Sequence, residues 1–210
     1  HEGIDVYDRR SQSFTHIQRP WIIVDSIGGR TWISSIVEIA DGSFLIGYSG
    51  QNELDSGLLV YDRKTGEFEK PPLIEDLDLT NVWGIQKSKD GTVWITGFRG
   101  LYKVNFEKNI AQKIESKDFQ AFRYFQTAID SSGLLWMTAN SSSLLSFNPT
   151  TEELKTYTYP HNVYAKNVFP ELDRIAIDRD NNVWLASSNG MVLFDIEKQS
   201  TSLSFFKSWN

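Results

Sequence analysis

Short apolar runs alternate along the chain with clusters of turn residues, and no stretch repeats its apolar positions with a helical period. Residues 82–87 and 93–98 are typical, because both runs are rich in Val, Ile, Trp or Thr and the turn dipeptide Asp90-Gly91 separates them. β-Branched and aromatic residues between turn signals predict β-strands. The pattern therefore predicts an all-β protein.

Two sequence phrases recur along the chain, and their spacing predicts how the strands are organised. The first is a turn residue followed by an apolar strand, as in Gly-Thr-Val-Trp-Ile at residues 91–95. Its copies begin at Gly42, Gly91, Gly133 and Asn181, which lie 49, 42 and 48 residues apart. The second is a strand such as Gly-Leu-Leu-Val-Tyr-Asp at residues 57–62. Its copies begin at Gly3, Gly57, Gly100, Ser143 and Gly190.

Each repeat divides into four strands, which in one unit are expected at residues 82–87, 93–98, 100–105 and 110–115. Four antiparallel strands in a repeat of roughly 40 to 50 residues predict the blade of a β-propeller. We expect a β-propeller of four-stranded antiparallel blades, with about four and a half blades present. The expected units of this partial propeller domain are a half blade at 1–18 and blades at 19–72, 73–116, 117–160 and 161–210.

The repeats do not divide into whole blades, because five copies of the second phrase face four copies of the first. Residues 1–18 supply only a third and a fourth strand, at 3–8 and 13–17. We expect the chain to be an arc of a seven-bladed ring, which needs on the order of 320 residues. The remaining blades of the parent propeller, or a second chain, would then cover the open edges. The alternative is a five-bladed ring with one two-stranded blade.

Large apolar residues recur at one position of the second strands, namely Leu45, Trp94, Trp136 and Trp184. A ligand platform does not need to recur in every blade, whereas the contact between adjacent blades does. We therefore expect these side chains to fill the space between blades. Ligand-binding residues are expected in the loops, which differ from blade to blade.

The repeat resembles a known family in its motifs. Residues 62–68, Asp-Arg-Lys-Thr-Gly-Glu-Phe, contain a Thr-Gly-x-Phe turn, and residues 148–154 are a close variant. Together with Asp-x-x-Gly-x-x-Trp and Gly-Leu-x-x-Tyr-Asp, these motifs resemble the two-component regulator propeller repeat over the whole chain. Leu45, Asn181 and Ser143 depart from the pattern without changing its register. Streptogramin-lyase-like propellers carry a related Gly-x-x-Trp phrase.

The resemblance implies a function as well as a fold. Members of this family form seven-bladed propellers in the extracytoplasmic sensor region of hybrid two-component histidine kinases, and such sensors commonly respond to oligosaccharides. The resemblance therefore implies a periplasmic, non-enzymatic sensing segment of an inner-membrane receptor, with an oligosaccharide or glycan-derived ligand. It also implies that a transmembrane helix and a kinase lie elsewhere on the parent chain.

Composition argues against several other functions. The 210 residues are 40% hydrophobic and 13% aromatic, which is enough for a core, and they include no Cys for a disulfide or a thiolate metal site. The net charge is -6 and the 21 Lys and Arg residues are scattered, which argues against nucleic acid as a partner. No apolar run approaches the roughly 20 residues that span a bilayer. We expect no direct membrane contact by this segment.

Candidate catalytic and metal-binding groups are sparse. The three histidines are His1, His16 and His161. No Gly-x-Ser-x-Gly phrase marks a nucleophile. Aspartates that we expect to stabilise turns through backbone hydrogen bonds are Asp41, Asp90 and Asp180. Residues 178–182 imitate the start of a calcium loop but lack its Gly and its final Glu. We predict no catalytic residue, no cofactor and no metal.

If the chain binds a ligand, we expect it on the face that carries the connections between blades and the loops after the second strands. Sugars are held by aromatic faces and by planar polar side chains that bond pairs of hydroxyls. The candidate ligand-binding residues on this face are Tyr48, Trp83, Arg99, Tyr124 and Asn140.

Two other functional classes remain open from the sequence. One is a propeller-type lyase or hydrolase, in which His161 or His16 acts as a base beside carboxylates from neighbouring loops. The other is a scaffold for dimerisation that has no small ligand of its own. Turnover of a substrate would distinguish the first of these from a binding module.

Overall fold

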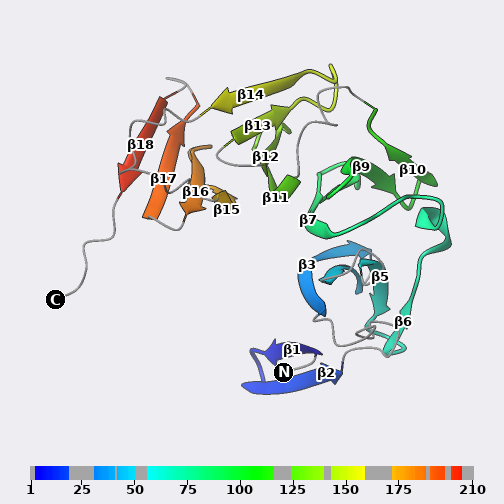
Figure 1. The fold of residues 1–210 in the computed structure, drawn as a ribbon. Helices are drawn as coiled ribbons and strands as arrows, with labels where there is room; N and C mark the ends of the chain where they lie inside the picture. The colour runs from blue at the N-terminus through cyan, green and yellow to red at the C-terminus, as the bar shows by residue number, and fades with distance from the viewer. Residues whose placement is uncertain are drawn as a thin grey trace.

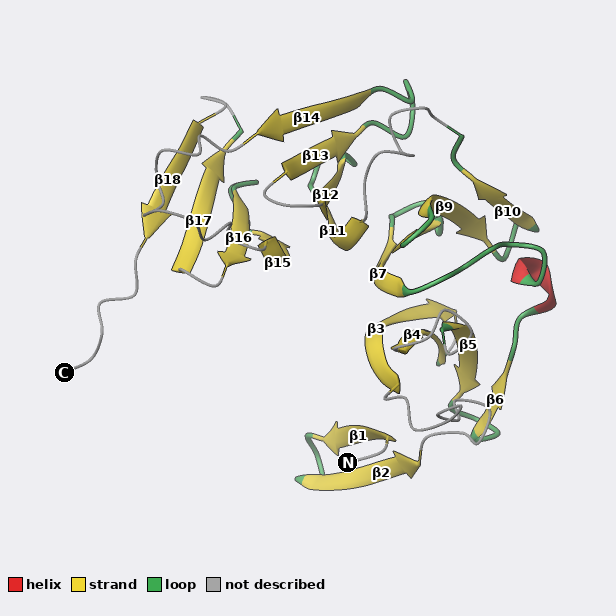
Figure 2. Cartoon of the chain, viewed as in Figure 1, coloured by secondary structure: helices red, strands yellow, loops and turns green. Residues whose placement is uncertain are grey.

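The structure is a computed structural model, and it describes residues 3–18, 31–40, 42–50, 56–115, 124–139, 143–158, 172–187, 190–196 and 200–204. Within these ranges the chain forms β-strands and one short 3-10 helix, Pro72–Ile74 (Figure 2). The predicted all-β class is confirmed. No helix in the described ranges is long and apolar enough to cross a membrane.

The strands form one two-stranded and four four-stranded antiparallel sheets. The half-blade consists of β1 (Gly3–Asp8) and β2 (Ser13–Gln18). Blade 1 consists of β3 (Thr31–Ala40), β4 (Ser43–Gly50), β5 (Gly57–Asp62) and β6 (Glu67–Glu69). Blade 2 consists of β7 (Val82–Lys87), β8 (Val93–Gly97), β9 (Gly100–Asn105) and β10 (Ile110–Lys113).

The last two sheets repeat this order of four strands adjacent in sequence. Blade 3 consists of β11 (Tyr124–Ile129), β12 (Leu135–Ala139), β13 (Ser143–Phe147) and β14 (Leu154–Thr158). Blade 4 consists of β15 (Leu172–Ile177), β16 (Val183–Ser187), β17 (Gly190–Asp195) and β18 (Ser200–Ser204).

The five sheets follow one another along an arc, as Figure 1 shows. The first strands β3, β7, β11 and β15 contact one another in succession and lie on the inner side of the arc, while the fourth strands lie farther out. This arrangement is a β-propeller of four-stranded blades, as the repeat predicted. Seven blades in the closed ring stays a prediction.

The cores lie between neighbouring blades, where a large side chain of each second strand packs against the next blade. Leu45 packs with the buried residues of blade 2. Trp94 packs with blade 3 and lies edge-on to Phe147, with ring centroids 5.8 Å apart. Trp136 packs with blade 4. The predicted role of these three residues between blades is confirmed, whereas Trp184 is half-buried in the last described blade.

The turns between first and second strands are organised by carboxylates. In blade 2, Asp90 accepts hydrogen bonds from the Ser88 hydroxyl and the Thr92 backbone N–H, as predicted. In blade 4 the organising residue is Asp178 and not Asp180, because Asp178 accepts bonds from the N–H groups of residues 180 and 182. Asp178 can bond both sides of the turn, since its other carboxylate oxygen accepts a hydrogen bond from the Trp184 indole. Asp41 lies outside the described residues.

Candidate functional site

Each blade has two ends, which we call the turn end and the loop end. The turn end carries the hairpins that join first to second and third to fourth strands. The loop end carries the loops between second and third strands and the connections between blades. The sequence predicts that a ligand would bind at the loop end, so we describe first the strands that reach this end.

Each of the four first strands that the structure describes contains a β-bulge close to the loop end. The extra residue is Ser34 in β3, Trp83 in β7 and Asp173 in β15, and in β11 residues 125–126 lie opposite a single partner. A bulge leaves backbone groups unpaired and redirects a side chain. The recurrent bulge therefore presents a variable residue on the inner strand of each blade.

The backbone groups at the bulge of blade 2 are satisfied by the neighbouring blades. The carbonyl of Val82 accepts hydrogen bonds from the hydroxyls of Ser34, at 2.5 Å, and Ser49, at 2.7 Å. The carbonyl of Trp83 accepts a bond from the side-chain amide of Gln126, at 2.7 Å. Because blades 1 and 3 both bind this bulge, the loop end of blade 2 is fixed from both sides.

A second group of contacts surrounds Asp78 in the connection that leads into blade 2. Its carboxylate lies 3.1 Å from the guanidinium of Arg99 and accepts a 2.9 Å hydrogen bond from the Thr80 hydroxyl. Its carbonyl accepts a 2.6 Å bond from the Tyr102 hydroxyl. Burial, followed by the charge of Asp78, raises the pKa of Tyr102 to about 12. Tyr102 thus remains a neutral donor that holds the connection in place.

The structure places three of the predicted residues at the loop end. Trp83 is half-buried, and its ring lies 6.0 Å from the ring of the more exposed Trp32 of blade 1. Arg99 is exposed in the β8–β9 turn, where Asp78 orients it. Tyr48 is half-buried and lies over Gly57, since a Cβ there would fall 2.8 Å from the Tyr48 hydroxyl.

The two remaining predicted residues are less fully defined. Tyr124 begins β11 and pairs with Ala139, so its backbone lies at the loop end of blade 3. Asn140 lies outside the described residues. No pattern in the sequence indicated Asp78 or Gln126 as positioning residues, because each acts on a residue at least 21 positions away.

The described residues offer few groups for catalysis or metal binding. They contain no group of three or more His, Asp and Glu side chains that could hold a metal ion. His16 and Asp5 are paired across the half-blade, with 2.8 Å between Nδ1 and Oδ1, and both side chains are about half exposed. His1 and His161 lie outside the described residues. Asp5 is placed to orient the His16 imidazole as a base. This pair lies away from the loop-end residues of blade 2.

No protein-family model and no curated protein matches the sequence. In structure the chain is similar to the extracellular domain of a proposed one-component system from B. thetaiotaomicron, with 17% identity, a TM-score of 0.71 and coverage of 97% of this chain and 27% of that chain. It is also similar to the extracellular domain of a proposed hybrid two-component system from the same organism, with 15% identity, a TM-score of 0.66 and coverage of 96% of this chain and 27% of that chain.

A third similar structure is virginiamycin B lyase from Staphylococcus aureus, with 12% identity, a TM-score of 0.66 and coverage of 94% of this chain and 61% of that chain. The chain thus spans about a quarter of the length of the two sensor domains and about six tenths of the lyase. These likenesses define the class of protein by its fold, a β-propeller of the kind found in extracellular sensor domains and in streptogramin lyases. They agree with the resemblance that the repeat motifs carry.

Proposed function

We propose that this propeller segment is a non-enzymatic ligand-binding part of a receptor in a bacterial two-component signalling system. The observation that carries the proposal is the loop end of blade 2, where a bulge held by both neighbouring blades presents Trp83 beside Trp32. Preorganised side chains lower the entropy lost on binding. By analogy with the similar extracellular domains, the segment lies outside the cytoplasm, in the periplasm of a cell with two membranes.

The ligand that fits these groups is an oligosaccharide. Indole rings pack against the C–H faces of sugars, and a guanidinium can donate hydrogen bonds to pairs of neighbouring hydroxyls. The exposed ion pair between Arg99 Nε and Asp78 favours one direction of the planar guanidinium group. Trp83 and Arg99 therefore supply the two kinds of contact that sugar binding requires.

The proposal is tested by calorimetric titration of a panel of neutral and acidic oligosaccharides. We expect Trp83→Leu and Arg99→Ala each to weaken the binding of the best ligand by about tenfold, since each removes one directed contact worth about 1.4 kcal/mol. The matched control is Arg179→Ala, which removes an exposed arginine at the turn end of blade 4. Unchanged affinity in both loop-end variants would contradict the proposal.

A second candidate function is lyase or hydrolase activity, and the pairing of His16 with Asp5 favours it. In this case Asp5 orients the imidazole, and the free ring nitrogen takes a proton from the substrate. The same oligosaccharides, and a streptogramin B, should then be cleaved. Cleavage that is lost in His16→Ala would replace the sensor proposal with this one.

A further inference from the structure

A groove of about 820 Å³ lies between the turn ends of blades 2 and 3, and we call it the turn-end groove. Its walls come from the β7–β8 turn of blade 2 and from the β11–β12 and β13–β14 turns of blade 3. Trp94, Lys89 and Lys103 are among the residues that line it. Because it lies at the opposite end of the blades from Trp83 and Arg99, it is separate from the ligand site proposed above.

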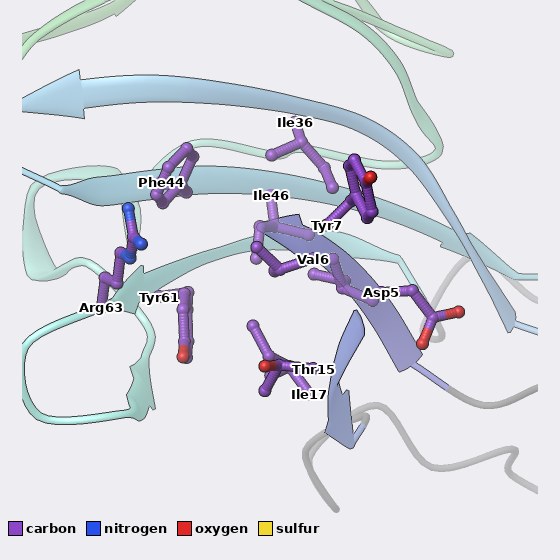
Figure 3. Close-up of a pocket in the computed structure, with 11 residues that line it drawn as sticks. Asp5, Val6, Tyr7, Thr15, Ile17, Ile36, Phe44, Ile46, Tyr61 and Arg63 are labelled. Carbon is purple, nitrogen blue, oxygen red and sulfur yellow. The ribbon is translucent and has the colours of Figure 1, made fainter. Parts of the chain in front are cut away.

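The groove between the half-blade and blade 1, drawn in Figure 3, is of a different kind. Most of the side chains that line it are apolar, among them Val6, Ile36 and Phe44. Apolar side chains do not specify one partner, whereas a hydrogen-bond donor specifies an acceptor. The turn-end groove carries such donors.

The turn-end groove is open because one contact between blades is absent there. Between blades 3 and 4, the Asn181 side chain donates a 2.6 Å hydrogen bond to the Ser131 hydroxyl and accepts a 3.0 Å bond from the Ser131 N–H. The residues at these positions in blades 3 and 2 are Gly133 and Lys89. Gly133 has no side chain, and a Cβ there would meet nothing within 4 Å. The turns of blades 2 and 3 therefore leave a groove where those of blades 3 and 4 are bonded.

The second-strand indoles of blades 3 and 4 show which acceptor this part of the repeat uses. Trp136 donates a 2.8 Å hydrogen bond to the carboxylate of Asp130, six residues earlier in the chain. Trp184 donates a 2.8 Å bond to Asp178 in the same way. In both blades a carboxylate from the turn bonds the indole N–H.

Trp94 is the equivalent indole of blade 2, and its N–H lacks this acceptor. The residue six positions earlier is Ser88, whose hydroxyl donates to the Asp90 carboxylate and to the Thr92 carbonyl. No group in the described ranges accepts a hydrogen bond from the Trp94 N–H. Trp94 is only 3% exposed and lines the turn-end groove, so an acceptor from outside the chain reaches its N–H through the groove.

The charges around the groove favour an anionic acceptor. The Lys103 ammonium group lies over the Trp94 ring, 5.8 Å from its centroid, and Lys89 is exposed. The carboxylates of Asp90 and Asp130 also line the groove, but both accept hydrogen bonds within their own turns. The groups left to contact a ligand are thus mainly donors, and a carboxylate is the acceptor that matches them. A sugar hydroxyl matches them less well, because it also donates.

We infer that the turn-end groove binds an acidic peptide segment of a partner protein. An Asp or Glu carboxylate of the peptide accepts a hydrogen bond from the Trp94 N–H and lies beside Lys103. The partner thus supplies the acceptor that Asp130 and Asp178 supply within blades 3 and 4. A short side chain suits the site, because the chain itself uses aspartate there and because the indole is almost fully buried.

The inference is tested by adding an acetylated and amidated Gly-Asp-Gly-Asp-Gly peptide to the isotope-labelled chain and following the indole N–H signals by NMR. We expect the Trp94 signal to move and those of Trp136 and Trp184 to stay, because their N–H groups are already bonded. The same peptide with Asn in place of Asp should bind about tenfold more weakly, because it offers no charge-assisted hydrogen bond. An equal movement of the Trp94 signal with the Asn peptide would overturn the inference.

A matched pair of variants tests whether the missing acceptor creates the site. Ser88→Asp gives blade 2 the same Asp-x-Asp turn that blade 4 has at residues 178–180, so its carboxylate should bond the Trp94 N–H and abolish peptide binding. Ser88→Ala adds no carboxylate and should leave the peptide affinity unchanged within about twofold. Unmoved Trp136 and Trp184 signals report that the blades keep their fold. Full peptide binding by Ser88→Asp would contradict the inference.

Two further comparisons identify the donor and the kind of ligand. Trp94→Phe keeps a ring between the blades but removes the N–H, and it should weaken peptide binding about tenfold. Trp184→Phe removes an N–H that already has an acceptor and should leave peptide binding unchanged. An oligogalacturonate with the same number of carboxylates is the competing source of this chemistry. If it moved the Trp94 signal at lower concentration than the peptide, the assignment to a peptide would be wrong.

Discussion

The turn end and the loop end of each blade are built in different ways. At the turn end, the carboxylates of Asp130 and Asp178 bond groups no more than six residues away, including the indoles of Trp136 and Trp184. At the loop end, the bond from Gln126 to the Trp83 carbonyl joins residues 43 apart. The turn-end carboxylates therefore act on local sequence, although the Asn181 side chain also bonds Ser131 in the turn of blade 3, whereas the loop-end bulge of blade 2 is held by the neighbouring blades. The comparison predicts that turn-end changes mainly alter stability, while loop-end changes mainly alter binding.

The largest expected effect is at Trp136, whose side chain is fully buried between blades 3 and 4. Trp136→Ala should lower the free energy of unfolding by about 3–5 kcal/mol, because it removes apolar contacts and leaves a cavity. The matched control is Trp184→Ala, which should cost less because Trp184 is half-buried. Urea denaturation measures both values, and equal losses would refute a role for Trp136 between blades.

A smaller loss is expected at Asp130, which accepts a 2.8 Å hydrogen bond from the buried Trp136 indole. Asp130→Ala leaves this donor without its acceptor and should lower the free energy of unfolding by about 1–3 kcal/mol. Ser132→Ala removes an exposed hydroxyl bonded to the same carboxylate and should cost less, about 0.5 kcal/mol. If the two variants were equally stable, the turn would not depend on the indole bond.

The smallest effect concerns acid pH at the turn of blade 2. The hydrogen bond from the Ser88 hydroxyl, with those from Thr92, lowers the pKa of Asp90 from 3.8 to about 2. A lowered pKa in the folded state means that the ionised carboxylate stabilises the fold above pH 3.8, and that this contribution is lost as the pH falls toward 2. Ser88→Ala should therefore lose less stability over this range than the unaltered protein. Denaturation at several pH values tests this, and identical curves would contradict it.

The sequence predicted the parts of the fold that depend on local patterns. The bounds of β1, β7 and β9 match the predicted strands, because turn residues such as Gly91 and Gly100 mark their ends. Leu45, Trp94 and Trp136 were assigned to blade contacts because they recur, and the structure confirms this. These features were predictable because the same residue type recurs at the same position of each repeat.

The bulges and the support of Arg99 could not be predicted in the same way. The bulge at Trp83 leaves no sign in the sequence itself; it appears in the structure, where Gly84 and Ile85 are both buried and interrupt the alternation of a regular strand. The contact of Asp78 with Arg99 leaves none, because the connection at residues 71–81 brings together charges 21 positions apart. Tyr48 was predicted to contact a ligand, and its position over Gly57 gives it a packing role as well.

The recurrent bulge has a consequence for how such a protein can evolve. The extra residue stands outside the pairing of its strand, so its replacement leaves the register of the blade unchanged. Three blades already carry a hydroxyl, an indole and a carboxylate there, at Ser34, Trp83 and Asp173. Selection can therefore vary this residue without shifting the strands of its own blade, although a change at Ser34 would also remove the hydroxyl that bonds the Val82 carbonyl of blade 2.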